Sequence, residues 1–210
     1  MRQEKMRGAR GGIMIYHNSF LFLFDCIVGE ESGESPLDWD VKYNKQVEYT
    51  VAMRVLAIDP GFGRAGVAVI DRIQNADILQ YSACIVTSAQ TPFPERLNAV
   101  MVEITALIGK HSPTLFALEK LFLTNNQKTA MRVAEVRGAL IALAASREIP
   151  ILEYTPLQVK VAITGYGKSR KSDIMRMLPH LIILPDARTR LDDEYDAIAI
   201  GLTALASYRP

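Results

Sequence analysis

The stretch that decides the fold is "MRVLAIDPGFGRAGVAVI", from Met53 to Ile70. Its first half is an apolar run that ends at Asp59, and Pro60 and Gly61 follow, a pair that commonly turns a chain. Its second half is again apolar and β-branched. Two such runs joined by a turn predict an antiparallel pair of strands. The first strand therefore ends in a carboxylate.

Outward from this stretch, the spacing of apolar residues alternates between the periods of strands and helices. Three β-rich runs joined by short turns indicate an antiparallel meander, and helices and strands alternate after it. This order is typical of an α/β protein with the ribonuclease-H-like fold, a mixed five-stranded sheet with helices on both faces. The expected strands are 54–59, 66–72, 78–87, 115–122 and 151–156, and the expected helices are 94–111, 127–147, 171–178 and 191–207.

The N-terminal quarter of the chain differs from the rest. Residues 1–52 carry six Lys and Arg against eight Asp and Glu, whereas residues 53–210 carry eighteen against fifteen. The apolar stretch 13–29 contains His17 and Asp25 and is too short to span a bilayer. The acidic stretch 30–40 after it has the composition of a linker. We expect 1–52 to be an N-terminal extension, either disordered or a start-site artefact, with a functional appendage as the alternative, and 53–210 to be the folded domain.

The two cysteines, Cys26 and Cys84, provide neither a disulfide framework nor the spacing of a zinc site. A reducing compartment suits such a chain, so we expect a cytoplasmic protein with no membrane partner.

Four carboxylates occupy positions where a charge is costly. Asp59 ends an apolar strand, Glu119 lies within the apolar run 115–122, and Asp193 and Asp196 share one face at the start of an apolar helix. Burying a lone carboxylate costs roughly several kcal/mol unless it is neutralised or binds a cation. The alternatives are that Asp59 only forms a turn and that Asp193 only interacts with the helix dipole.

These four acids form one cluster if the two strands are neighbours and the helix packs across them. Clustered carboxylates repel one another unless a hard divalent cation lies among them, and all-oxygen ligation suits Mg²⁺ or Mn²⁺. Paired ions of this kind promote in-line attack of water on a phosphodiester. The three histidines, His17, His111 and His180, lie outside these elements. The pattern therefore predicts metal-dependent hydrolysis without a histidine, serine or cysteine nucleophile.

Four segments of the chain resemble the successive motifs of the RuvC family, the bacterial Holliday-junction resolvases. The segments are "LAIDPGFGRAGVAVI", "FALEKLFLTNNQKTAMRVAEVRGAL", "EYTPLQVKVAITGYGKSRKSDI" and "DDEYDAIAIGL". The similarity covers 53–210 in the right order, and 1–52 resembles nothing in the family. Because members usually begin within a residue or two of the first strand, Met53 is expected to be the natural start. The resemblance implies a structure-selective endonuclease that resolves Holliday junctions during recombination and DNA repair.

The resemblance also implies roles for particular residues. The catalytic and metal-binding tetrad would be Asp59, Glu119, Asp193 and Asp196, holding two Mg²⁺ per active site, with Mn²⁺ able to substitute. Asp192 remains open as a replacement for Asp193, because it also shares a helical face with a second acid.

The expected DNA contacts come from the same resemblance. Phe122 would insert among the bases of the junction, and Lys160 and Lys171 would engage the region of the scissile phosphate. Arg170, together with Lys168 and Arg176, would contact the backbone. In "VAEVRG", Ala134 and Glu135 replace a glycine and an amide expected from the family, which puts a nearby phosphate contact in doubt.

The implied assembly is a homodimer whose two active sites cut opposing strands of four-way junction DNA, with the RuvA and RuvB branch-migration machinery as partners. Three alternatives stay open. They are a junction-binding protein that no longer cuts, another ribonuclease-H-like nuclease of YqgF type, and a relative of the actin and sugar-kinase group. The preferred cleavage sequence and the choice between Mg²⁺ and Mn²⁺ do not follow from the sequence.

Overall fold

The computed structural model describes residues 51–121, 127–186 and 188–208, which all belong to one compact unit of the chain. The expected extension over 1–52 lies almost entirely outside the described residues. The first strand begins two residues before Met53. The elements are β1 (Val51–Asp59), β2 (Arg64–Ile73), β3 (Ala76–Val86), α3 (Phe93–His111), β4 (Leu115–Glu119), α4 (Gln127–Ser146), β5 (Ile151–Tyr154), α5 (Pro156–Thr164), α6 (Lys171–Leu181) and α7 (Asp192–Ser207).

The five strands form one mixed sheet in the order β3-β2-β1-β4-β5. The first three strands pair antiparallel as a meander, and β4 and β5 add to β1 in parallel. Residues 65–70 of β2 are buried without interruption, as expected for a strand covered on both faces. The predicted mixed five-stranded sheet is confirmed.

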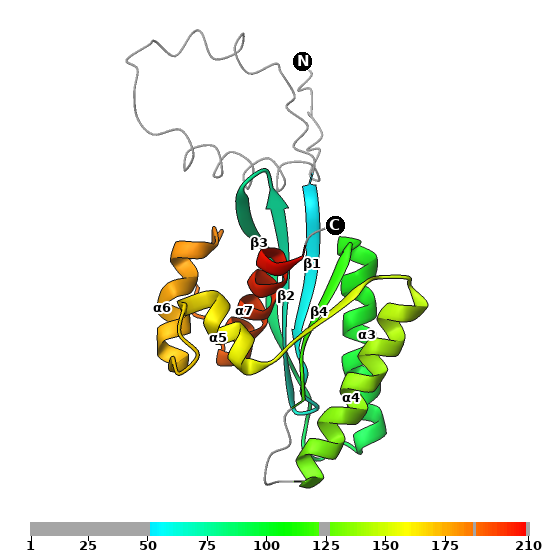
Figure 1. Cartoon of the computed structure of the whole chain (residues 1–210). Helices are drawn as coiled ribbons and strands as arrows, with labels where there is room; N and C mark the ends of the chain where they lie inside the picture. The colour runs from blue at the N-terminus through cyan, green and yellow to red at the C-terminus, as the bar shows by residue number, and fades with distance from the viewer. Residues whose placement is uncertain (1–50, 122–126, 187, 209–210) are drawn as a thin grey trace, which may run out of the picture. The chain divides into compact units, whose positions relative to one another are not determined.

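Helices cover both faces of this sheet (Figure 1). Leu56, Ile58 and Phe116 point to the face that α3 and α4 cover, where they form one apolar core. Ala57 and Ala117 point to the opposite face, where a second core forms with α5, α6 and α7. Because successive side chains of a strand point to opposite faces, each strand contributes to both cores.

Helix α7 lies closest to the sheet. Its residues 197–205 are all buried, as its nearly continuous apolar pattern predicts. Gly201 permits this approach, because a Cβ there would lie 2.7 Å from Cδ1 of Ile70 and 3.1 Å from Cβ of Ala57. Tight packing of α7 fixes the height of its first turn above the sheet.

Two sequence predictions were wrong in detail. The strand predicted over 115–122 ends at Glu119, so the polar end of β4 is the acid itself. Helix α5 was missed, although "TPLQ" carries its signal. Thr155 accepts a hydrogen bond from the Gln158 amide at 3.1 Å, the Gln158 side chain accepts one from the Thr155 amide at 2.8 Å, and Pro156 occupies the first helical position.

Within the part of the chain that the structure describes, none of the helices combines the length and apolar character needed to cross a bilayer.

Candidate active site

Asp59 and Glu119 end two neighbouring parallel strands. Ile58 of β1 pairs with Leu118 of β4, so the two acids are the next residues at the same edge of the sheet. Strand alternation puts them on the same face as Ala57 and Ala117, which is the face covered by α7. The register of one parallel strand pair therefore brings together acids sixty positions apart in the sequence.

Helix α7 brings its first turn to the same place. Asp59 lies opposite Gly66 of β2. A Cβ on Gly66 would lie only 1.8 Å from the backbone oxygen of Asp193, so a side chain is excluded there. This close approach places Asp193 beside the end of β1.

The acids interact electrostatically. Burial, followed by the negative charges of Asp196 and Asp193, raises the pKa of Asp59 to about 6. Burial, followed by the charges of Asp59 and Asp196, raises the pKa of Glu119 to about 7. Burial also raises the pKa of Asp196, although an ion pair opposes this. The carboxylates therefore repel one another as one electrostatic group.

Two basic side chains form ion pairs with three of the acids of α7. The Nζ of Lys171 lies 2.7 Å from Oδ2 of Asp196 and 3.6 Å from Oδ2 of Asp192. The guanidinium of Arg64, at the start of β2, lies 3.1 Å from Oδ2 of Asp193. Lys171 was expected at the site, whereas Arg64 was missed, because a single Arg after a turn carries no distinguishing pattern.

A cavity of about 190 Å³ opens beside these acids. Its charged lining comes from four of the predicted residues, Glu119, Lys160, Lys171 and Asp196, and apolar residues of α5, α6 and α7 complete it. The structure thus brings two predicted acids and both predicted lysines to one cavity. Arg137 of α4 supports its rim, since it donates a hydrogen bond to the Glu119 carbonyl at 3.1 Å and pairs with Glu153 of β5.

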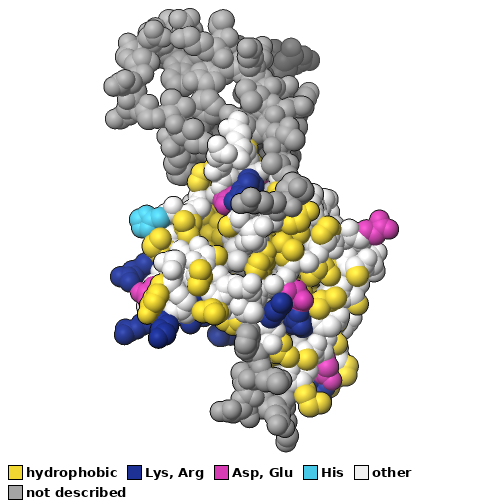
Figure 2. All heavy atoms as spheres, viewed as in Figure 1, with side chains coloured by type: hydrophobic (Ala, Val, Ile, Leu, Met, Phe, Trp, Pro, Cys, Tyr) yellow, Lys and Arg dark blue, Asp and Glu magenta, His cyan; other side chains and the backbone are white. Residues whose placement is uncertain are grey.

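The remaining predicted residues lie as follows. The side chain of Asp193 is 16% exposed and that of Asp192 is 61% exposed. Of these two acids, only Asp193 contributes to the raised pKa of Asp59. Arg170 is exposed at the start of α6, next to Lys171. Figure 2 shows Lys and Arg side chains gathered on the side of the molecule where α5 and α6 lie. Phe122 lies outside the described residues.

The donor set fits a hard divalent cation, because carboxylates that repel one another are stabilised by an oxygen-liganded ion among them. Across residues 51–121, 127–186 and 188–208, however, no three His, Cys, Asp or Glu side chains already lie close enough to share an ion. Asp193 and Asp196 are held by Arg64 and Lys171. The predicted ligand tetrad therefore remains a prediction.

Comparison with known proteins identifies the family. The family described as "Crossover junction endodeoxyribonuclease RuvC" matches residues 55–204. The chain belongs to the RuvC family. RuvC proteins of Pelotomaculum thermopropionicum and Desulfitobacterium hafniense are 35% and 40% identical to it, each over 150 residues that make up 71% of this chain and 91% and 90% of theirs.

A solved structure agrees with this assignment. The structure named "T. thermophilus RuvC in complex with Holliday junction substrate" matches with a TM-score of 0.67 and 28% identity, over 73% of this chain and 93% of that chain. The predicted family and the ribonuclease-H-like fold are confirmed. Nucleases of the RuvC family are in general metal-dependent, and membership decides against the YqgF-type and sugar-kinase alternatives.

Proposed function

We propose that this chain is a crossover junction endodeoxyribonuclease, which resolves Holliday junctions by symmetric, metal-dependent hydrolysis of phosphodiesters in DNA recombination and repair. The observation that carries the proposal is the meeting of Asp59 and Glu119 at one edge of the sheet with Asp193 and Asp196 of α7. The names of its RuvC relatives supply the reaction and the substrate.

In the proposed mechanism, Asp59, Glu119, Asp193 and Asp196 hold divalent cations, two per active site, with Mg²⁺ as the expected ion and Mn²⁺ as a substitute. When bound, these ions stabilise the charge that develops on the phosphate and on the leaving oxygen. Asp193 is preferred over Asp192, because of these two acids only Asp193 contributes to the raised pKa of Asp59.

Basic residues bind and orient the DNA. Lys160 and Lys171 line the cavity next to Glu119, where they would neutralise charge on the scissile phosphate. Arg170 is exposed directly before Lys171 at the start of α6, a position that suits backbone contacts. By family resemblance, Phe122 would insert among the bases of the junction.

Lys171 and Arg64 would exchange partners when DNA binds. Without DNA, Arg64 forms an ion pair with Asp193, and Lys171 forms one with Asp196. An incoming phosphate offers them an alternative anion, and their departure frees Asp193 and Asp196 as ligands. Binding of DNA and binding of metal would therefore support each other.

The proposed assembly is a homodimer, since two equivalent sites suit the symmetry of a four-way junction. RuvA and RuvB are the proposed partners by family resemblance. We assign the nuclease to the domain 53–210 and no function to 1–52.

Cleavage of a synthetic mobile four-way junction tests the proposal. Wild-type protein with Mg²⁺ should produce symmetric nicks on the junction and none on linear duplex or flap DNA. Glu119→Gln should abolish cleavage while junction binding persists. Glu103→Gln, on the exposed face of α3, is the matched control and should cut normally. Tight junction binding without cutting in either Mg²⁺ or Mn²⁺ would leave a non-cleaving junction-binding protein.

A further inference from the structure

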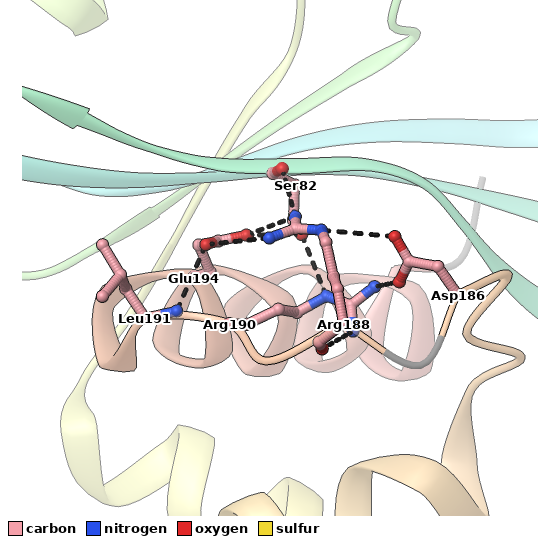
Figure 3. Close-up of polar contacts among 6 residues, drawn as sticks. All are labelled: Ser82, Asp186, Arg188, Arg190, Leu191 and Glu194. Atoms are coloured by element: carbon pink, nitrogen blue, oxygen red, sulfur yellow. Dashed lines mark hydrogen bonds and ion pairs between the residues drawn. The ribbon is translucent and has the colours of Figure 1, made fainter.

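Glu194 stands between Asp193 and Asp196 in the sequence, but its carboxylate lies in a different environment. Only 5% of its side chain is exposed. It points toward Ser82 of β3, as Figure 3 shows, and it does not line the cavity beside Glu119 and Asp196. A carboxylate this deeply buried requires specific partners, because an unpaired one would be strongly destabilising.

Both oxygens of this carboxylate accept hydrogen bonds. Its Oε2 accepts hydrogen bonds from the Ser82 hydroxyl at 2.8 Å and from the Arg188 guanidinium at 2.7 Å. Its Oε1 accepts one from the Leu191 amide at 3.2 Å and a second from Arg188 at 3.3 Å. Burial opposes ionisation, but these donors outweigh it and hold the pKa of Glu194 below its ordinary value.

The same donors attach the loop before α7 to the edge of the sheet. Arg188 also donates to the backbone oxygen of Ser82 at 2.7 Å, and Arg190 donates to the Ser82 hydroxyl at 3.2 Å. Asp186 pairs with both arginines. Glu194 is the member of this network that belongs to α7, so it links the helix itself to β3 (Figure 3).

We propose that Glu194 is a positioning residue: anchored to Ser82 and Arg188, it fixes the first turn of α7 so that Asp193 and Asp196 stay beside Asp59. It contacts neither the substrate nor the ions. This inference rests on the proposed nuclease function, because the acids that it positions are the proposed ligands.

The opposite end of α7 offers a matched control. Arg72 of β2 pairs with Asp77 at 2.8 Å and donates to the Leu205 carbonyl at 2.5 Å. Asp77→Asn would therefore loosen the C-terminal end of the same helix, through the same kind of ion pair. It leaves the first turn and its acids attached to β3.

The test uses the full-length protein without DNA and two measurements, Mn²⁺ titration by electron paramagnetic resonance and amide hydrogen exchange along α7. Glu194→Ala should accelerate exchange in the first turn and weaken Mn²⁺ binding about tenfold, as loss of a residue that orients ligands does, and Glu194→Gln should weaken it less. Asp77→Asn should accelerate exchange only near Leu205 and leave Mn²⁺ affinity at the wild-type level. Ser82→Ala provides a milder variant if Glu194→Ala does not fold.

Faster exchange in Glu194→Ala with unchanged Mn²⁺ affinity would overturn the proposal, because Glu194 would then stabilise the helix without positioning its acids. A second readout is junction cleavage by Glu194→Gln, which should return at saturating Mn²⁺, since all four proposed ligands are still present. A wild-type protein that does not cut junctions would refute the proposed function. The exchange and Mn²⁺ results in the absence of DNA would still decide the role of Glu194.

Discussion

Gly66 of β2 and Asp193 of α7 touch through their backbones, with no room for a side chain between them. A Cβ on Gly66 would lie 1.8 Å from the Asp193 oxygen and 2.4 Å from its carbonyl carbon. Because both neighbours are backbone atoms, no rotamer change can relieve the overlap. Gly66 is also the partner of Asp59 across β1 and β2, so this contact sets the distance between two of the proposed ligands.

Gly66→Ala should therefore displace the first turn of α7. We expect a loss of about 1–3 kcal/mol in the free energy of unfolding, the typical cost of overpacking. The rate of junction cleavage should fall by more than the loss of folded protein accounts for. Gly109→Ala on α3, where a Cβ meets nothing within 4 Å, is the control and should gain about 0.5–1 kcal/mol. Chemical denaturation and cleavage assays on both variants check this, and a Gly66→Ala variant as stable and active as wild type would contradict it.

The raised pKa values of Asp59 and Glu119 predict how stability depends on pH. In the absence of divalent ions, the folded state binds protons at these two groups up to about pH 6 and 7, whereas the unfolded chain releases them near pH 4. The contribution of these two groups to the free energy of unfolding should therefore fall as pH rises from about 4 to 7.

Glu119→Gln removes one of these repulsions, so at pH 8 in EDTA its free energy of unfolding should exceed that of wild type by on the order of 1 kcal/mol. Thermal melting across pH 4–8 measures the difference. The gain should disappear at pH 4, where wild-type Glu119 is protonated. A gain of equal size at both pH values would show that it does not arise from ionisation.

Arg64 should limit metal binding in the free protein, because it pairs with Asp193 at 3.1 Å. Arg64→Gln is expected to bind Mn²⁺ several-fold more tightly without DNA and to bind the junction more weakly at low salt, since a cation near the phosphates is lost. Arg64→Lys keeps the charge and should stay close to wild type. Tighter Mn²⁺ binding together with unchanged junction binding would mean that Arg64 does not move to a phosphate.

The basic residues at the start of α6 should contribute unequally to junction affinity. Arg176 is already ion-paired with Asp173 at 2.5 Å, whereas Arg170 contacts that acid through its backbone amide. Arg170→Ala should reduce the slope of log affinity against log salt by about 1, and Arg176→Ala should reduce it less. Lys110→Ala on α3, away from α6, serves as the control for overall charge. Binding isotherms at several salt concentrations decide between these outcomes.

Much of the fold and the two strand acids of the candidate site could be predicted from periodicity and from the cost of buried charge. Asp59 ends an apolar run and Glu119 lies within one, where few explanations other than a site suit a carboxylate. Helix α5 was missed despite its capping signal, because the strand predicted over 151–156 includes Thr155 and Pro156, which in the structure are the N-cap and the first residue of the helix. Arg64 was missed because its partner, Asp193, lies 129 positions away.

The sequence by itself determined most of the strands and helices, that β1 ends in an acid and β4 contains one, and that α7 is buried nearly all round, because these properties follow from local patterns of apolar and charged residues. Only the tertiary structure decided among the three consecutive acids at the start of α7. Asp192 faces solvent and Lys171, Asp193 lies against Gly66, and Glu194 is buried beside β3. Their side chains are chemically similar, and their roles differ only because the packing of α7 on the sheet fixes its rotation.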